Sequence, residues 1–306
     1  MKKITVILSV VLLMFTDTSY AQQDAMYSQY LFNPFIINPA YAGSRESFSS
    51  VLLYRDQWSG IDGSPKTSTF SMHGPMKNKR VALGAQIMTD QIGPTNNLSA
   101  MMTYAYHLEL GPGKLSMALR GGFYNSRLDV NKLQGRDQED FSNLGSVDAL
   151  APSFDFGMYY YTNRFFAGVS STHLTQQRLG YNNFPADANV HLNRHYFANI
   201  GGVFEMGENV LFRPSALIKY VEGAPVNVDV NSSFLLYKTV WLGASYRINQ
   251  AMVFMMELNI TEQIRLGYSY DYLLDPMQNV GKGAHELFIG YDFQIFKDRT
   301  VSPRYL

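Results

Sequence analysis

Cysteine is absent from the 306 residues of the chain, and charged residues are scarce. Without thiols the protein can form neither disulfide bridges nor thiolate zinc sites, and it has no cysteine nucleophile. Asp, Glu, Lys and Arg make up 16% of the sequence, against roughly 25% in a typical soluble domain. The 25 basic and 25 acidic residues balance, which argues against a nucleic-acid-binding protein with its basic excess.

Long apolar runs are also missing. No stretch of about 18 or more apolar residues occurs, so the sequence contains no membrane-spanning helix. Aromatic side chains, in contrast, are abundant, with 21 Tyr and 20 Phe. Low charge, many aromatic residues and short apolar stretches are typical either of a large soluble β protein or of a membrane β-barrel, whose alternating strands keep the mean hydropathy low.

The N-terminus predicts export. Two lysines precede an apolar stretch, and residues 19–21 form a small-x-small cleavage site. These are the parts of a secretory signal peptide, so we assign residues 1–21 to it and expect the mature chain to begin at Gln22. Export and the absence of cysteine together indicate a protein of a bacterial envelope.

From Phe48 onward, segments of about ten residues alternate apolar side chains with small or polar ones. In residues 264–272, for example, Ile, Leu and Tyr alternate with Arg, Gly, Ser and Asp. We therefore assign residues 48–306 to an all-β fold, a transmembrane antiparallel outer-membrane β-barrel of about 14 strands, an even number that suits a single-chain bacterial barrel. The predicted strands are 48–58, 66–74, 81–90, 97–108, 114–125, 151–161, 164–173, 195–204, 210–220, 226–237, 239–247, 251–260, 263–273 and 284–296.

The connections between the predicted strands also point to such a barrel. If the N-terminus is periplasmic, the even-numbered connections are short turns, and the odd-numbered ones include the long stretches 126–150, 174–194 and 274–283. A soluble sandwich has no reason to separate loop lengths by parity. We expect the apolar face to contact lipid and the face rich in Gly, Ser, Ala and Thr to line the lumen. The charges expected on that inner face are Arg120, Arg265, Asp271, Glu286 and Asp292.

Residues 22–47 differ from the rest of the mature chain, because they hold two Asn-Pro pairs and several aromatic side chains. Asn-Pro favours turn initiation and interrupts a strand ladder. We expect this irregular segment to enter the barrel from the periplasm, either as a plug in the lumen or as a surface for a periplasmic partner. It precedes the first strand, so deleting residues 23–44 is expected to leave a folded barrel.

Candidates for catalysis or metal binding are few. His191 and His195 have the i,i+4 spacing of a zinc-binding helix, but on an extended strand they lie roughly 13 Å apart, too far to share a metal. Asp137, Glu139 and Asp140 supply three carboxylates, whereas calcium needs about six oxygen ligands. The sequence has no Gly-x-Ser-x-Gly elbow. It therefore predicts no catalytic site, no metal and no cofactor.

Four stretches carry a resemblance to a known family. Residues 27–34 read YSQYLFNP, residues 37–44 read INPAYAGS, residues 54–61 read YRDQWSGI and residues 283–287 read GAHEL. They resemble the PorP/SprF family of type IX secretion system membrane proteins, over nearly the whole mature chain. One departure is Leu306, since tails of this family usually end on an aromatic residue. The matching positions that we expect to bind a partner or plug the lumen are Tyr27, Ser28, Gln29, Phe32, Asn33, Asn38, Pro39, Tyr41, Gly43, Arg55 and Trp58.

The resemblance implies a multi-pass outer-membrane barrel of the bacteria that use type IX secretion and gliding motility. It implies as partners the C-terminal domain of a large secreted adhesin, periplasmic type IX secretion components, or both. The protein would then support export of the adhesin or hold it at the cell surface, with no enzymatic activity and no nucleic acid involved. The residues leave one alternative, an outer-membrane diffusion channel or a transporter of apolar solutes, since barrels of this size can enclose an open lumen.

Overall fold

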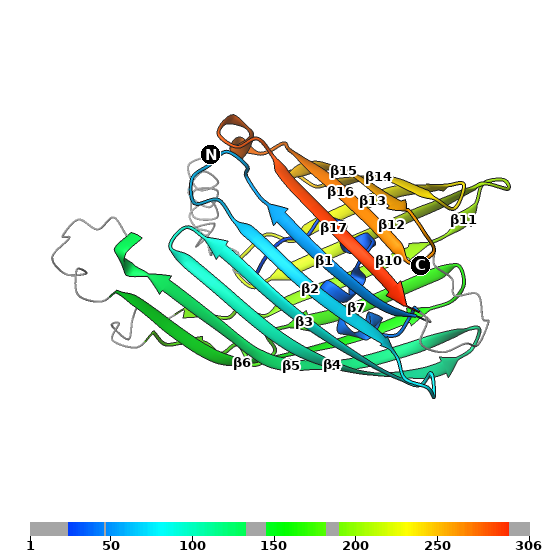
Figure 1. The fold of residues 1–306 in the computed structure, drawn as a ribbon, viewed down its shortest axis with the longest axis horizontal. Coiled ribbons are helices and arrows are strands. Elements are labelled where there is room, and N and C mark those ends of the chain that lie inside the picture. Colours follow the sequence, from blue (N-terminus) through cyan, green and yellow to red (C-terminus); the bar gives the residue numbers. More distant parts are fainter. Residues whose placement is uncertain (1–23, 46, 133–144, 182–189, 294–306) are drawn as a thin grey trace, which may run out of the picture.

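The computed structural model describes residues 24–45, 47–132, 145–181 and 190–293. They form a closed antiparallel β-barrel around an irregular segment from the start of the chain (Figure 1). Within this part of the chain, no helix is long and apolar enough to cross a membrane. Fourteen strands make the wall: β1 (Phe48–Asp56), β2 (Lys66–Pro75), β3 (Val81–Ile92), β4 (Thr95–Leu110), β5 (Gly113–Asp129), β6 (Ser146–Tyr161), β7 (Phe165–Thr172), β10 (His195–Gly202), β12 (Val210–Val221), β13 (Asn227–Leu236), β14 (Val240–Arg247), β15 (Ala251–Asn259), β16 (Ile264–Leu273) and β17 (Ala284–Phe293).

The barrel closes through three antiparallel pairings. β1 pairs with β17, and β10 pairs with both β7 and β12, so the sheet returns on itself. Three short strands lie outside this wall: β11 (Phe204–Glu205) extends the pairing of β12, while β8 (Arg178–Leu179) and β9 (Val190–His191) pair with each other. The predicted all-β barrel of fourteen strands is confirmed.

The largest error in the predicted bounds concerns β5 and β6. Residues 126–129 and 146–150, which the sequence analysis assigned to a loop, continue these two strands. Their outward side chains include Arg127 and Asp148, which lie opposite each other in the ladder. Backbone pairing does not require an apolar outer face, so the ladder persists where the alternation with apolar residues has already stopped.

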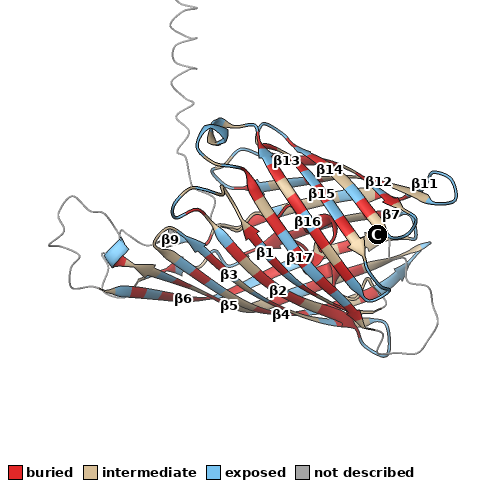
Figure 2. Ribbon diagram, turned by 45° about the horizontal axis from the view of Figure 1, so that its top comes forward, coloured by how far each residue is buried: buried red, intermediate tan, exposed pale blue. Residues whose placement is uncertain are grey.

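Side chains point alternately toward lipid and toward the lumen, as the pleat of a strand requires. Figure 2 shows this as buried and exposed residues following one another along the strands. On β16, Tyr268 is 41% exposed, whereas the next residue, Ser269, is fully buried. The predicted assignment of the two faces is confirmed, because the five charges expected in the lumen are all buried: Arg120, Arg265, Asp271, Glu286 and Asp292.

The two ends of the barrel have different connections. The turn end is the end where β1 begins, and its connections are 76–80, 111–112, 162–164, 203–209, 237–239 and 260–263. The opposite loop end carries the longer connections 57–65, 130–145, 173–194 and 274–283, together with the short ones 93–94, 222–226 and 248–250. The long connections thus gather at one end of the barrel, as the sequence predicts.

Candidate functional site

The segment inside the barrel, residues 24–45, is called the lumen segment below (Figure 1, dark blue). It folds into three 3-10 turns, η1 (Gln29–Leu31), η2 (Pro34–Ile36) and η3 (Pro39–Tyr41). Proline begins η2 and η3 because the first position of a helical turn needs no N–H and suits the fixed φ of proline. The Asn38 side chain accepts a hydrogen bond from Ala40 N at 2.9 Å and caps η3. Turn initiation at both Asn-Pro pairs is confirmed.

Asp24, the first described residue, lies at the loop end. Its carboxylate is 2.8 Å from His173 Nε2 and 3.3 Å from His195 Nδ1, and Thr172 Oγ1 donates to it at 3.3 Å. Burial alone would raise the pKa of Asp24, but the charge and the hydrogen bond of His173 hold that pKa below its usual value. Burial would lower the pKa of His173, yet Asp24 raises it. The contact between Asp24 and His173 therefore fixes this end of the segment.

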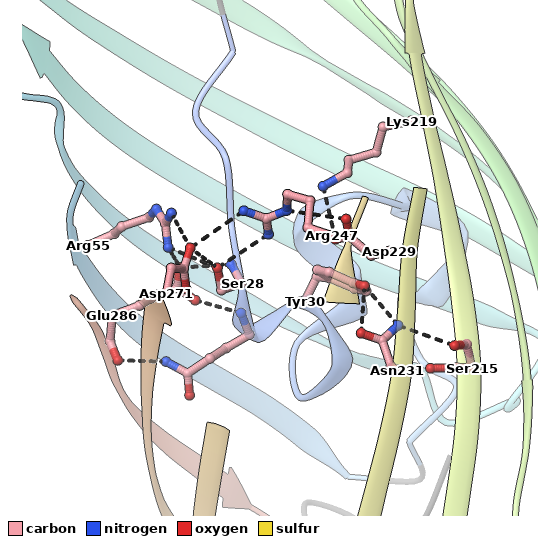
Figure 3. Close-up of polar contacts among 11 residues, drawn as sticks. Ser28, Tyr30, Arg55, Ser215, Lys219, Asp229, Asn231, Arg247, Asp271 and Glu286 are labelled. Carbon is pink, nitrogen blue, oxygen red and sulfur yellow. Dashed lines mark hydrogen bonds and ion pairs between the residues drawn. The ribbon is translucent and has the colours of Figure 1, made fainter. Parts of the chain in front are cut away.

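Nearer the barrel centre, the backbone of the lumen segment binds a buried carboxylate (Figure 3). Ser28 N and Gln29 N donate to the two carboxylate oxygens of Glu286, at 2.9 and 2.8 Å. The Ser28 hydroxyl donates to Asp271 at 2.7 Å and accepts from Arg55 at 3.0 Å. A buried carboxylate is stable only when it is paired and hydrogen-bonded. Glu286 thus depends on the segment as well as on the wall.

Three cations and three anions balance one another around Ser28, and we call them the lumen charge cluster: Arg55, Lys219, Asp229, Arg247, Asp271 and Glu286 (Figure 3). Arg55 lies 2.8 Å from Asp271 and 3.0 Å from Glu286. Arg247 bridges Asp229 at 3.2 Å and Asp271 at 3.5 Å, and Lys219 lies 3.0 Å from Asp229. Since each ion is paired, loss of one member leaves an opposite charge without its partner in a buried site.

Aromatic side chains of the segment fill the middle of the lumen. Phe32 packs against Phe288, the one large apolar residue on the inner face of β17, with ring centroids 6.1 Å apart. The Arg213 guanidinium lies 5.5 Å from the ring centroid of Phe32 and 4.2 Å from that of Trp241, within the range of cation–π attraction. Phe32, Trp241 and Phe288 belong to one apolar cluster that joins the segment to β1, β12–β15 and β17.

Polar groups of the segment also have partners on the wall. Arg120 Nη1 donates to the carbonyl oxygen of Phe35 at 3.2 Å, and Ser170 Oγ donates to that of Ile37 at 2.7 Å. Side-chain pairs between segment and wall are Tyr27–Thr69 at 2.9 Å, Tyr30–Asn231 at 2.9 Å and Asn33–Ser71 at 2.9 Å. The wall therefore fixes the segment by specific hydrogen bonds along its length.

The segment leaves the lumen at the turn end. Asn38 Nδ2 donates to the carbonyl oxygen of Met158 at 3.1 Å. Tyr41 contacts Tyr159 edge to face, with ring centroids 5.4 Å apart. Both wall residues lie near the end of β6, so η3 packs against the wall at the turn end of the lumen, shortly before β1 begins.

Gly43 makes the final bend toward β1. Its φ is +75°, and a Cβ atom at this position would overlap the side chain of Ala82. Only glycine meets both conditions, because other residues are strained at such a φ and carry a Cβ. Beyond the bend, Arg45 forms an ion pair with Asp292 at 3.3 Å.

The structure brings ten of the eleven predicted site residues together at the interface between segment and wall. Gly43 is half-buried and the others are buried. Arg55 is the one wall residue among them, and it contacts Ser28 directly. Trp58 lies apart, in the 57–65 connection at the loop end. The ten residues in contact are Tyr27, Ser28, Gln29, Phe32, Asn33, Asn38, Pro39, Tyr41, Gly43 and Arg55.

Several residues of the site escaped the sequence analysis, among them Asp24, Arg213, Asp229 and Arg247. For Asp229 a signal exists, because it alternates with Val230, which is exposed on the lipid face. The same alternation of inward and outward positions predicts which charged residues of the other strands face the lumen. Asp24 has no such signal, since its contacts depend on where the irregular segment runs.

A cavity of about 100 Å³ remains in the lumen near the loop end. Its lining combines apolar side chains with charged ones, and includes Asp24, Met26, Met88, Phe197, Leu217 and Lys219. The space is enough for several water molecules, each of which needs roughly 10–15 Å³. In the described ranges, no group of three or more His, Cys, Asp or Glu side chains is placed to hold a metal ion.

Taken together, a closed antiparallel barrel with apolar side chains outside and paired charges inside defines an outer-membrane protein, here one whose lumen is occupied by its own chain. The family model of the type IX secretion system membrane protein PorP/SprF matches residues 19–291, and the chain belongs to this family. The protein is therefore an outer-membrane barrel with a role in type IX secretion. No curated protein matches the sequence.

Solved structures of similar shape are outer-membrane proteins with little sequence in common. The Acinetobacter baumannii outer membrane protein Omp33 is 10% identical, with a TM-score of 0.49 over 82% of this chain and 100% of that one. The CymD monoaromatic hydrocarbon channel is 11% identical, with a TM-score of 0.49 over 86% of this chain and 93% of that one. The KdgM porin is 8% identical, with a TM-score of 0.39 over 80% and 99% of the two chains.

Proposed function

We propose that this protein is a non-enzymatic component of type IX secretion and gliding motility that binds another protein at the outer membrane. The partner is the C-terminal domain of a large secreted adhesin, a component of the periplasmic secretion machinery, or both. Binding supports export of the adhesin or its attachment to the cell surface.

The filled lumen is the observation that carries this proposal. Wall charges that would face a permeating solute contact the lumen segment instead: Glu286 accepts from two segment N–H groups, and Arg120 donates to a segment carbonyl. A diffusion channel needs a continuous path lined by available polar groups. A lumen closed by its own chain favours a protein that binds partners at the two ends of the barrel over one that conducts solutes through it.

Pairing of the buried charges favours a non-enzymatic role. Asp155 lies 2.6 Å from Arg120, and Glu257 lies 3.2 Å from Arg265. A general acid or base must come within hydrogen-bond reach of a substrate proton. Carboxylates that are buried and occupied by guanidinium groups do not offer such contact.

The loop end offers the surface for an exported partner. It carries the long connections, and the 57–65 connection contains Trp58 and Ile61, which are both half-buried. Tryptophan is enriched among the residues that dominate binding energy at protein interfaces. We propose Trp58 as a partner contact, in contrast to the ten site residues at the interface between segment and wall, which serve the plug. The aromatic-bearing stretch 179–184 is a further candidate anchor for this contact; Leu179 is buried, and residues 182–184, like the acidic residues 137–140, lie outside the described residues.

Affinity purification from native outer membranes tests the proposal. Affinity-tagged protein is isolated after mild cross-linking, and its partners are identified by mass spectrometry. We expect an adhesin fragment or a periplasmic secretion component, with the adhesin signal reduced at least several-fold in Trp58→Ala and unchanged in Tyr237→Ala, an exposed aromatic residue of a turn-end connection.

Conductance in a planar bilayer addresses the channel alternative. The purified barrel is expected to show no steady ion conductance, because the lumen segment closes it. Steady conductance of the unmodified protein, together with the absence of any specific partner in the purification, would contradict the proposal and favour the diffusion channel.

A further inference from the structure

We infer that the lumen segment threads the entire barrel and that the first residues of the mature chain lie at its outer mouth, on the cell-surface side. The sequence alone suggests the opposite, a segment that enters from the periplasm and keeps its N-terminus there. The inference concerns the path of the chain, and it holds whichever partner the protein binds.

Contacts along the segment follow the barrel axis from one end to the other. Asp24 lies beside Thr172 and His195, where β7 ends and β10 begins, which is the loop end. Arg45 pairs with Asp292 near the end of β17, which is the turn end.

Intermediate residues contact intermediate levels of the wall in the same order. Ser28 binds Arg55 and Asp271, near the loop-end limits of β1 and β16. Further along the segment, Asn33 binds Ser71, which lies closer to the turn-end limit of β2. The ordered succession of contacts excludes a hairpin that would enter and leave the lumen at the same end.

Loop length then gives the orientation in the membrane. Outer-membrane barrels carry short turns on the periplasmic side and longer loops on the outside. The loop end, with its connections 130–145 and 173–194, is therefore the outer end. With the expected cleavage after Ala21, only Gln22 and Gln23 precede Asp24, so the new N-terminus lies within a few residues of the outer mouth.

The pair formed by Asp24 and His173 fixes this arrangement. It holds the segment where the lumen opens to the long connections, and it also borders the remaining cavity. Two consequences follow. Residues 24–31 are out of reach of any periplasmic partner while the barrel is folded, and the half-buried residues 24–26 border the surface that an exported partner meets.

Single thiols on intact cells test this path, because the protein has no cysteine of its own. Three variants are compared with a membrane-impermeant maleimide: Ala25→Cys in the segment, Glu222→Cys in a loop-end connection and Glu208→Cys in a turn-end connection. Assembly of each variant is checked by heat-modifiable migration. A second measurement uses a short epitope inserted between Gln23 and Asp24, detected by antibody on intact cells.

We expect Ala25→Cys and Glu222→Cys to react on intact cells, and Glu208→Cys to react only after the outer membrane is permeabilised, with at least a tenfold difference in labelling. The epitope should be detected without permeabilisation. The inference is overturned if Ala25→Cys behaves like Glu208→Cys, or if all three thiols require permeabilisation. If the thiol at position 25 is unreactive in both conditions, the epitope measurement tests the inference. Detection of the epitope only after permeabilisation then overturns the inference as well.

Discussion

Replacing Arg55 by glutamine is expected to destabilise the barrel strongly. Arg55 contacts Asp271 at 2.8 Å, Glu286 at 3.0 Å and the Ser28 hydroxyl at 3.0 Å. Without it, the lumen charge cluster keeps two cations, Lys219 and Arg247, against three carboxylates. Removing one partner of a buried ion pair costs about 3–5 kcal/mol, because the remaining charge stays buried without compensation.

Arg164→Gln provides the matched control. Arg164 forms an ion pair with Glu205 at 3.3 Å, a distance similar to those in the cluster. The two side chains are 77% and 67% exposed, so water replaces the partner when the pair is broken. Exposed pairs of this kind contribute about 0–1 kcal/mol. The same substitution therefore differs in its effect through the burial and the number of the charged partners.

Urea unfolding of the purified variants in lipid vesicles measures the difference, with the folded fraction read from heat-modifiable migration. A loss of several kcal/mol for Arg55→Gln and less than about 1 kcal/mol for Arg164→Gln is expected. Equal losses for the two variants would refute the argument that the lumen charge cluster is a buried, mutually dependent unit. Water would then be solvating Asp271 and Glu286 in place of the segment.

Three further expectations concern other parts of the molecule. Tyr268→Arg, which places a charge on the lipid face in the middle of β16, should cost about 2–4 kcal/mol in a vesicle unfolding assay, whereas Tyr237→Arg in an exposed turn should be close to neutral. Gly43→Ala should lower the yield of assembled barrel through its overlap with Ala82, whereas Gly111→Ala, also at positive φ but with open space around it, should lower it much less; equal yields would contradict this. Below the usual pKa of histidine, the charged pair of Asp24 and His173 contributes fully to the stability of the docked segment. This contribution is lost as the pH rises through the raised pKa of His173. On acidification it is lost only below the usual pKa of aspartate. Maleimide labelling of Ala25→Cys should consequently accelerate, relative to labelling of Glu222→Cys, as the pH rises from the usual pKa of histidine through the raised pKa of His173, and Asp24→Asn should abolish this acceleration.

Strand number, order and facing could be predicted because period-two alternation is a local property of the sequence. The inner position of Arg120, Asp271 and Glu286 follows from parity along β5, β16 and β17. The path of residues 24–45 could not be predicted in this way. It depends on partners that lie far away in the sequence, such as Glu286 for Ser28 and Asp292 for Arg45, and no periodicity encodes these contacts.

The described structure also changes what deleting the segment should do. The sequence suggests a folded barrel after deletion, because no strand ladder includes the segment. The ladder is indeed independent of it, but the inner wall is not. Phe288, Trp241 and Leu53 are apolar residues on the inner face that are buried against the segment's cluster, and each would become exposed to water at a cost of about 1.5–3 kcal/mol.

Loss of the segment's own buried side chains adds costs of the same size, and Glu286 loses two charge-assisted hydrogen bonds worth about 1.5–3 kcal/mol each. These costs are comparable with the whole stability of an ordinary domain, about 5–15 kcal/mol. Deletion of residues 24–44 should therefore abolish recovery of heat-modifiable barrel from the outer-membrane fraction. Deletion of the 3-10 turn η6 (Pro276–Asn279), which contains no buried residue, is the control and should leave recovery unchanged. Normal recovery of the segment deletion, accompanied by new ion conductance, would show instead that the wall tolerates a water-filled lumen and that the segment is a removable plug.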